Sequence, residues 1–292
     1  MKEKIKEIRI PARLHAPETS LRIRMVYKNK ASLASLPYVF ILPGGPGSNH
    51  SYYMDYDCLH EVANLVYYDP RGCGLSDTGE RSSYTLSNYI DDLHLMITAL
   101  QVGPVILLGK SYGAISALGY TLRYPQELRQ LILAAGAPSY HFLDTAKSNI
   151  LSRGTAEQQR ICNDLWEGQI KNQEHMDQFF KTMATMYSWK KRNNRPVNRP
   201  ASTHSFSFDA ANEGFSNQLW QFDYVSKLDT IQCPTLILVG EEDWITDPQY
   251  SKQMAEMIPK SILQVFKHAD HSLESDVPEL YFSTLMNFIR VC

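Results

Sequence analysis

The sequence predicts a doubly wound α/β fold, in which a mostly parallel sheet carries helices on both faces. The first observation is a series of short, continuous apolar runs that end in turn residues, as Tyr38–Leu42 ends in Pro43 and Gly44. Runs of this kind are typical of strands that are buried on both faces. The second observation is that amphipathic helical patterns lie between the runs. Strands and helices therefore alternate along most of the chain, as a parallel sheet requires.

The strands are predicted from two kinds of pattern. Residues 4–10 and 21–27 alternate apolar and polar side chains, as half-buried strands do. The continuous apolar runs then predict buried strands at Tyr38–Leu42 and at residues 65–68, 105–108, 131–133, 236–239 and 262–266.

Three helical patterns support the alternation. Residues 89–100 place apolar side chains on one face, and Ser87 precedes them as a candidate N-cap. Residues 113–124 form a compact pattern that Pro125 ends. Pro278–Arg290 begins with a proline, which suits the first turn of a helix. Its predicted buried side consists of Leu280, Leu285, Phe288 and Ile289.

One stretch interrupts the alternation. Between residues 139 and 220 the strand-like runs vanish, and residues 155–173 and 174–190 show helical patterns instead. We therefore expect a helical cap (a lid) at 139–220, inserted after the sixth strand. The catalytic domain is then expected to consist of residues 1–138 and 221–292.

Charge and cysteine content exclude several classes of protein. The 292 residues include 29 Lys+Arg and 31 Asp+Glu, which gives a formal charge of −2. A nucleic-acid-binding protein would carry a basic surplus, so no nucleic-acid partner is expected. The basic, proline-containing segment at 190–200 is expected to be a solvated loop. The five cysteines are scattered, without the spacing of a metal site or a disulfide framework.

The chain is expected to be cytoplasmic. Residues 1–17 alternate charged and apolar residues and lack the apolar core of a signal peptide. No apolar run approaches the roughly 18 residues that a membrane span needs, so no membrane partner is expected. Scattered cysteines suit a reducing compartment. The oligomeric state stays open.

A candidate nucleophile lies in the segment Gly109-Lys110-Ser111-Tyr112-Gly113, which matches the G-x-S-x-G nucleophile elbow. The pattern gains weight from its context, because a buried strand is predicted before it and a helix after it. Small flanking residues are needed where the backbone turns sharply and neighbours crowd it. These features predict that Ser111 is a catalytic nucleophile.

A serine nucleophile needs a histidine base, which an acid in turn orients. The expected chain order for this elbow is serine, acid, histidine. Asp243 follows the strand that ends near Gly240, and His271 follows the last strand. Catalytic groups of α/β sheets gather at the carboxyl ends of strands, so Asp243 and His271 are the predicted acid and base. The competitors are His268, Glu242, Asp247 and Asp270.

The oxyanion of the reaction intermediate needs main-chain N–H donors. One is expected from Tyr112, which follows the nucleophile. The other is expected from the Gly-rich loop after the third strand, where glycine lets the backbone approach the substrate. Pro46 has no N–H, so Gly45 is the favoured donor of that loop and Gly44 the alternative.

These motifs, taken in order, resemble the proline iminopeptidase family of α/β-hydrolases, in particular its tricorn-interacting aminopeptidase branch. The resemblance covers roughly residues 20–138 and 225–292. It is carried by Gly44-Gly45-Pro46-Gly47, Tyr68-Asp69-Pro70-Arg71-Gly72-Cys73-Gly74-Leu75-Ser76, the elbow at 109–113, Gly240-Glu241-Glu242-Asp243 and His271. It implies an α/β-hydrolase fold and hydrolysis through an acyl-enzyme on Ser111, with no metal or cofactor.

The resemblance also implies that acidic residues near the cap bind the free amine of the substrate. Glu213, in an Asn-Glu-Gly-Phe context, matches the family's cap glutamate. Relatives carry a second glutamate after the triad acid, where this chain has Trp244, and a histidine where it has Pro43. Trp244 is expected either to contact the amine by cation–π attraction or to make the pocket apolar.

Two further features of the motifs concern support of the site. Asp69 and Arg71 are expected to support it through an ion pair and loop hydrogen bonds. Lys110, inside the elbow, has no functional account from the sequence.

Three functions follow from these residues. The leading one is a serine aminopeptidase that releases an N-terminal residue, proline or another apolar residue, from short peptides. The second is a carboxylesterase, lactonase or amino-acid amide hydrolase on the same triad, which the Met- and Phe-rich cap and Trp244 favour. The third, a non-catalytic ligand-binding relative, is disfavoured because Ser111, Asp243 and His271 are all present.

Overall fold

The computed structural model describes residues 1–291. Its centre is an eight-stranded sheet with the strand order β1-β2-β4-β3-β5-β6-β7-β8. Strand β2 is antiparallel to both of its neighbours, whereas the strands β3 to β8 all run parallel to one another. The strands are β1 (Lys2–Ile10), β2 (Thr19–Tyr27), β3 (Tyr38–Leu42), β4 (Asn64–Tyr68), β5 (Val105–Lys110), β6 (Leu128–Ala134), β7 (Thr235–Gly240) and β8 (Ser261–Phe266).

Strand β5 shows why the apolar runs form buried strands. Val105 and Leu107 belong to the core on one face of the sheet, whereas Ile106 and Leu108 belong to the core on the other. All four side chains are fully buried. Successive side chains of a strand point to opposite faces, so a run without polar residues fits only a strand that is covered on both sides.

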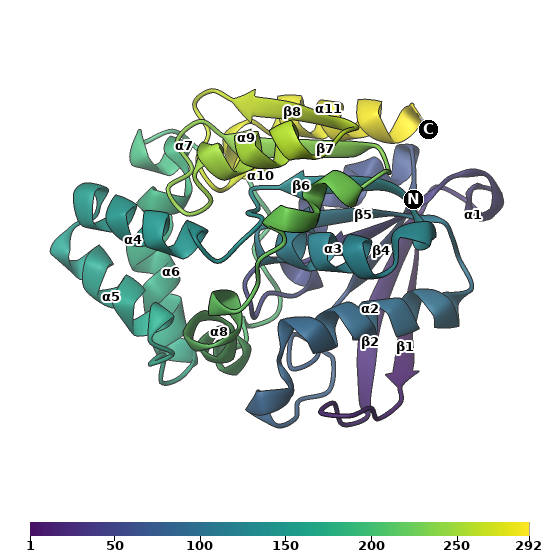
Figure 1. Ribbon diagram of the computed structural model, residues 1–292, viewed down its shortest axis with the longest axis horizontal. Coiled ribbons are helices and arrows are strands. Elements are labelled where there is room, and N and C mark those ends of the chain that lie inside the picture. Colours follow the sequence, from purple (N-terminus) through teal and green to yellow (C-terminus); the bar gives the residue numbers. More distant parts are fainter. Residues whose placement is uncertain (292) are drawn as a thin grey trace.

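Helices cover both faces of the sheet (Figure 1). The first face packs against α2 (Leu86–Leu100), α3 (Tyr112–Arg123) and α9 (Pro248–Met257). The second packs against the 3-10 helix η1 (His50–Glu61) and α11 (Pro278–Arg290). The short remaining elements of this part are α1 (Ser32–Ser35), η2 (Arg81–Ser83), η3 (Pro125–Glu127), η5 (Val225–Thr230) and α10 (Leu273–Asp276).

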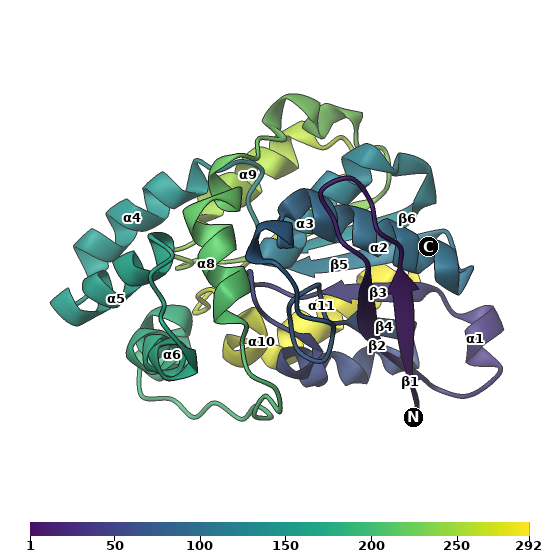
Figure 2. The same ribbon diagram turned by 90° about the horizontal axis from the view of Figure 1, so that it is seen from below.

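The part of the β6–β7 connection that runs from α4 to η4, called the cap below, contains no strand. Its helices are α4 (Phe142–Arg153), α5 (Ala156–Trp166), α6 (Gln173–Tyr187), α7 (Trp189–Arg192), α8 (Phe208–Ser216) and η4 (Gln218–Trp220). It has an apolar cluster of its own, to which Phe179 and Met183 of α6 belong. The cap lies at one end of the sheet and α1 at the other (Figure 2). The predicted fold class, including an insertion after the sixth strand, is confirmed.

Four local expectations were wrong. Helix α2 is capped by Thr85, whose hydroxyl accepts the N–H of Asn88 at 3.1 Å, so Ser87 lies inside the first turn. Leu280 is 54% exposed, because the buried stripe of α11 is formed by Tyr281, Leu285 and Ile289 at steps of four.

The other two wrong expectations lie in the cap. The helix expected over 155–173 ends at Trp166, and Gly168 follows with a φ of 68°, a conformation that favours glycine. The segment at 190–200 is not simply a solvated loop, because it begins in α7 and two of its arginines bind carboxylates beside the candidate site. Helices α4 and α8 were not expected. Within residues 1–291, no helix has the length and apolar character that crossing a membrane takes.

Candidate active site

Ser111 occupies a strained turn between β5 and α3. Its φ is 56° and its ψ is −120°, which is costly for a residue with a side chain. A Cβ on Gly109 would lie 2.2 Å from the carbonyl oxygen of Gly113, and a Cβ on Gly113 would lie 2.1 Å from that of Leu42. Both glycines are therefore required by packing, and the spacing of the G-x-S-x-G motif follows from the turn itself.

Asp243 and His271 meet at the carboxyl ends of two neighbouring strands. Asp243 follows β7, His271 follows β8, and Nδ1 of His271 lies 2.8 Å from Oδ2 of Asp243. Both side chains are buried. The other oxygen, Oδ1, accepts the N–H groups of Ile245 at 2.9 Å and Thr246 at 3.0 Å. The carboxylate is thus fixed by its own loop, and it can hold the imidazole in one orientation.

The electrostatics of Asp243 keep it ionised. Burial alone would raise its pKa, but the charge and hydrogen bond of His271 and the charge of Lys110 outweigh burial and lower the pKa below its ordinary value. A carboxylate in this state accepts the Nδ1 proton of His271 and leaves Nε2 free to take a proton from a nucleophile.

The competing residues lie elsewhere. His268 is exposed and packs on Trp189 with ring centroids 4.8 Å apart. Asp247 caps α9 by accepting the N–H of Gln249. Glu242 and Asp270 both bind Arg192 at 2.6 Å. Among the candidates, only Asp243 is hydrogen bonded to the ring of His271 within residues 1–291.

Ser111 and His271 line one cavity, to which the Gly-rich loop also contributes. No hydrogen bond joins the Ser111 hydroxyl to the His271 ring in the part of the chain that the structure describes. Catalytic hydrogen bonds often form at full strength only with substrate present. The two side chains therefore face the same cavity, without a direct hydrogen bond between them.

The main-chain donors of this cavity can be distinguished. The N–H of Gly44 donates to the hydroxyl of Tyr53 at 2.6 Å, so it is occupied. The N–H groups of Gly45 and Tyr112 have no acceptor within residues 1–291. Of the two glycines considered as oxyanion donors, Gly45 is free to serve and Gly44 is not. Gly45 and Tyr112 both line the cavity.

The cap supplies an apolar wall to the cavity. Met176, Phe179 and Phe180 of α6 take part, and Phe206 approaches from the segment before α8. Trp244 completes this wall, only 2% exposed and packed edge-to-face on Tyr187. Its indole N–H has no hydrogen-bond partner in the described chain. The wall is therefore apolar, and it contains one buried donor without a hydrogen bond.

The structure does not bring Glu213 to the cavity. Its carboxylate lies 3.5 Å from Nε of Arg81 and accepts hydrogen bonds from Asn217 at 3.2 Å and Gln218 at 3.1 Å. Glu213 is absent from the cavity lining, whereas Trp244 belongs to it. Of the two residues expected to bind a substrate amine, only Trp244 is in position to touch a substrate.

Sequence reasoning missed a charged cluster in the cavity wall. The ammonium of Lys110 donates to the main-chain oxygen of His271, and it lies 3.9 Å from Oε2 of Glu274. Nη1 of Arg199 binds the other oxygen of Glu274 at 2.8 Å, and Nε of Arg199 binds Asp55 at 2.7 Å. The unusual Lys110 in the elbow was the only signal of this cluster in the sequence.

Glu274 is ionised in this cluster. Burial would raise its pKa, but the charges of Lys110 and Arg199 lower the pKa below the ordinary value. Its Oε2 is buried and has no hydrogen-bond partner in residues 1–291. Glu274 is also one of the residues that line the cavity.

The D-x-R-G-x-G segment supports the loop after β4, but not through an ion pair between its own members. Arg71 binds Asp92 through two hydrogen bonds of 2.9 Å. Asp69 instead accepts the N–H of His50 at 2.8 Å and that of Leu75 at 2.8 Å. The expected ion pair exists with a different partner, one from helix α2.

The fold and the site define the class of the protein. Residues 37–274 match the alpha/beta hydrolase fold family, and the chain belongs to it. The chain is also similar to proline iminopeptidases, as its motifs predicted.

The chain is 29% identical over 262 residues to the proline iminopeptidase PfmaB of Pestalotiopsis fici, and the match covers 87% of this chain and 92% of that protein. It is 27% identical over 291 residues to the proline iminopeptidase of Saccharolobus solfataricus, which covers 91% and 89%. Among solved structures, a proline iminopeptidase-related protein from Thermus thermophilus superposes with a TM-score of 0.71 at 22% identity, over 98% of this chain and 97% of that one.

Proposed function

We propose that this protein is a serine aminopeptidase that releases an N-terminal residue, proline or another apolar residue, from short peptides. The observation that carries the proposal is the buried His271–Asp243 hydrogen bond of 2.8 Å beside a strained Ser111 in one cavity. The similarity to proline iminopeptidases over most of the chain supports the peptide substrate.

The proposed reaction uses these residues in two stages. His271 takes the proton of the Ser111 hydroxyl as the oxygen attacks the substrate carbonyl, and Asp243 stabilises the imidazolium. The N–H groups of Gly45 and Tyr112 bind the oxyanion. His271 then gives its proton to the leaving amine, which departs and leaves an acyl-enzyme on Ser111. A water molecule, deprotonated by His271, hydrolyses the ester and restores the serine.

We propose Glu274 as the residue that binds the free amine of the substrate. It is the only carboxylate that lines the cavity within residues 1–291, and its Oε2 accepts no hydrogen bond, although Lys110 lies 3.9 Å away. A buried ammonium needs such a partner, because desolvating an unpaired charge is costly. Glu213 would serve only if Arg81 and its two amide partners gave way.

The first test asks whether Ser111 is needed for hydrolysis but not for folding. Ser111→Ala should abolish hydrolysis of prolyl and alanyl anilides and leave the thermal unfolding temperature nearly unchanged, since alanine is smaller than serine. An alanine variant that retains wild-type turnover would refute the proposal.

The second test concerns the amine. Wild-type protein should hydrolyse free amino-acid anilides much faster than their N-acetyl forms. Glu274→Gln should raise KM for the free-amine substrates by about tenfold and leave the N-acetyl forms unaffected. Glu213→Gln is the matched control. If it shows this selective loss and Glu274→Gln does not, the amine site belongs to Glu213.

A second candidate function is a carboxylesterase, or an amino-acid amide hydrolase, on the same triad. The apolar wall and the unused indole N–H of Trp244 favour it, since this donor suits a neutral acceptor better than an ammonium. Fast hydrolysis of short acyl esters without anilide activity would select this function.

The expected cytoplasmic location also stays a proposal. It rests on the scattered cysteines, and a fractionation that finds the mature protein with the secreted proteins would contradict it.

A further inference from the structure

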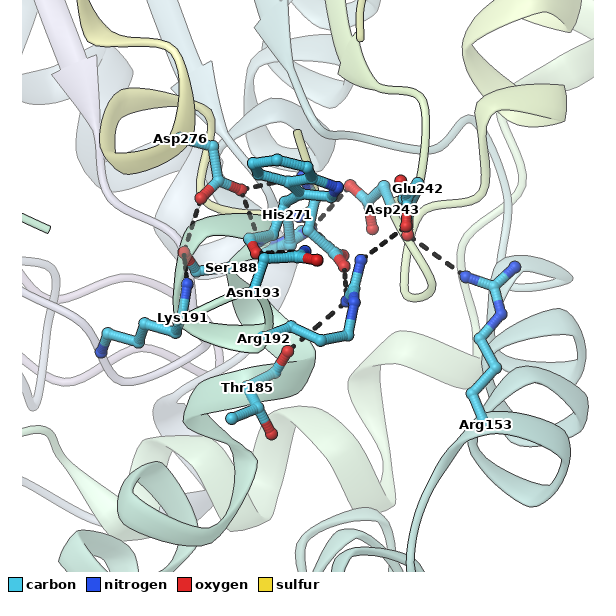
Figure 3. A network of polar contacts seen from close by, with 12 residues as sticks. Arg153, Thr185, Ser188, Lys191, Arg192, Asn193, Glu242, Asp243, His271 and Asp276 are labelled. Atoms are coloured by element: carbon cyan, nitrogen blue, oxygen red, sulfur yellow. Dashed lines mark hydrogen bonds and ion pairs between the residues drawn. The ribbon is translucent and has the colours of Figure 1, made fainter. Parts of the chain in front are cut away.

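A single arginine of the cap binds both loops that carry the acid and the base. Nη2 of Arg192, at the end of α7, lies 2.6 Å from Glu242, and Nη1 lies 2.6 Å from Asp270. Glu242 immediately precedes Asp243, and Asp270 immediately precedes His271. Figure 3 shows the guanidinium of Arg192 directed at Glu242 beside the Asp243 and His271 side chains.

The contact with Asp270 leads directly to the backbone of the base. Asp270 is fully buried, and its second oxygen accepts the N–H of His271 at 2.9 Å. One carboxylate therefore joins the cap guanidinium to the main chain at His271. A shift of this carboxylate would move the imidazole relative to Asp243.

Arg192 also offsets a concentration of negative charge. Glu242, Asp243 and Asp270 lie together on the two loops. Burial, and then the charge of Asp243, raise the pKa of Asp270 to about 7, although Arg192 acts in the opposite direction. Without the guanidinium the ionised form of Asp270 would be costlier still, and the two loops would lose the cation between them.

We propose that Arg192 is a positioning residue of the triad. By binding Glu242 and Asp270 at once, it sets the separation of the two loops and so the geometry of the His271–Asp243 pair. This inference rests on the proposed function, because it gives Arg192 a role in the same reaction. It makes the cap part of the catalytic apparatus as well as a wall of the cavity.

The docking of α7 does not depend on Arg192 alone. The hydroxyl of Ser188 donates to Asp276 at 2.5 Å, and the N–H of Trp189 donates to the same carboxylate at 2.9 Å. The main-chain oxygen of Tyr187 accepts the N–H of Ser272 at 2.9 Å. These contacts should keep the segment in place when Arg192 is changed, so a variant reports on positioning and not on loss of the cap.

Stability and catalysis should therefore respond differently. The Arg192 side chain is 34% exposed and that of Glu242 is 41% exposed. The Arg192–Glu242 pair should therefore contribute little to stability. Asp270 is fully buried, but its pKa is already about 7, so near neutral pH it can take up a proton when Arg192 is removed. A small displacement of a catalytic base, in contrast, costs a large factor in rate.

The experiment compares Arg192→Met and Arg192→Lys with Arg195→Met, a matched change three residues away whose arginine is exposed. The readouts are kcat and KM on a short acyl ester and on prolyl anilide, the rate of labelling by a fluorophosphonate, and the thermal unfolding temperature. Arg192→Met should lower kcat and the labelling rate by about tenfold or more. KM should stay within about twofold and the unfolding temperature within about 2 °C. Arg192→Lys should recover part of kcat, and Arg195→Met should resemble wild type.

Asp270→Asn supplies the decisive second variant, because it keeps an acceptor for the N–H of His271 without the charge. If Arg192 acts through Asp270, Arg192→Met should cost less in the Asp270→Asn background than in wild type. Equal losses in both backgrounds, or unchanged kcat and labelling in Arg192→Met, would overturn the inference while the proposed function stands. Wild-type protein that neither hydrolyses nor labels would overturn both.

Discussion

The proposed nucleophile, Ser111, and the proposed base, His271, are held in place by different means. Ser111 is positioned by its own backbone, since Gly109 and Gly113 let the turn close against neighbouring carbonyl groups. His271 is positioned by side chains from several elements: Asp243 at its ring, Lys110 at its carbonyl and Asp270 at its N–H. The first arrangement is local in sequence, whereas the second joins parts of the chain that are far apart.

This difference predicts how each half of the site fails. A side chain added at Gly109 or Gly113 should collide with backbone, and should damage fold and activity together. A change around His271 should alter charges and hydrogen bonds and should reduce activity in graded steps.

The largest effect is expected from Gly113→Ala. The new Cβ would lie 2.1 Å from the carbonyl oxygen of Leu42, so β3 or α3 must shift. We expect a loss of stability of more than about 4 kcal/mol in urea unfolding, together with loss of activity. Gly119→Ala, in the same helix, is the control, because its Cβ would meet only the ends of the Ile90 and Tyr224 side chains. Equal losses of stability in the two variants would show that Gly113 is no more restricted by packing than Gly119.

A smaller effect is expected from Lys110→Met. The change leaves the buried Glu274 without one of its two cations and the His271 carbonyl without its donor. We expect a loss of about 3 kcal/mol of stability and a lower kcat. The double variant Lys110→Met with Glu274→Gln should recover much of the stability, since the unpaired charge is then gone. Additive losses in urea unfolding would show that the pair does not interact.

The sequence predicted the three triad candidates better than the charged side chains around them. Ser111, Asp243, His271 and the strands before them follow patterns of neighbouring residues, so strand ends and chain order were enough to place them. Arg192 and Glu274 have no such pattern. Their roles arise from contacts across about fifty or more positions of the chain, and an arginine in a basic segment predicts a solvated side chain.

Glu213 illustrates the opposite error. Its sequence context matched an amine-binding glutamate, but its carboxylate lies 3.5 Å from Nε of Arg81, which belongs to η2. The expectation for Asp69 and Arg71 failed for the same reason. An ion pair was expected in this segment, but Arg71 binds Asp92 of α2. Residue type predicted that these groups would be paired, but only the fold determines with what.

A moderate, pH-dependent effect is expected from Asp270→Asn. The folded protein holds the pKa of Asp270 near 7, above the ordinary value of 3.8, so ionisation of Asp270 destabilises the fold as the pH rises from 3.8 to 7. The asparagine variant should therefore be more stable than wild type at pH 8, by roughly 1 to 2 kcal/mol, and about equal to it at pH 4. Urea unfolding at both pH values measures this, and a difference that grows toward low pH would contradict the sign.

The smallest effect is expected from His268→Ala. The side chain is exposed and contacts Trp189 on the surface of the cap. We expect kcat/KM within about twofold of wild type, since surface changes away from a site are nearly neutral. A loss as large as that of His271→Ala would mean that the base has been assigned to the wrong histidine.

The most direct measurement is covalent labelling by a fluorophosphonate, with the modified residue located by peptide mass spectrometry. The account predicts a single label on Ser111 in wild-type protein and a labelling rate lower by at least about a hundredfold in His271→Ala. A label on another residue, or a rate that is the same with and without the imidazole, would contradict it.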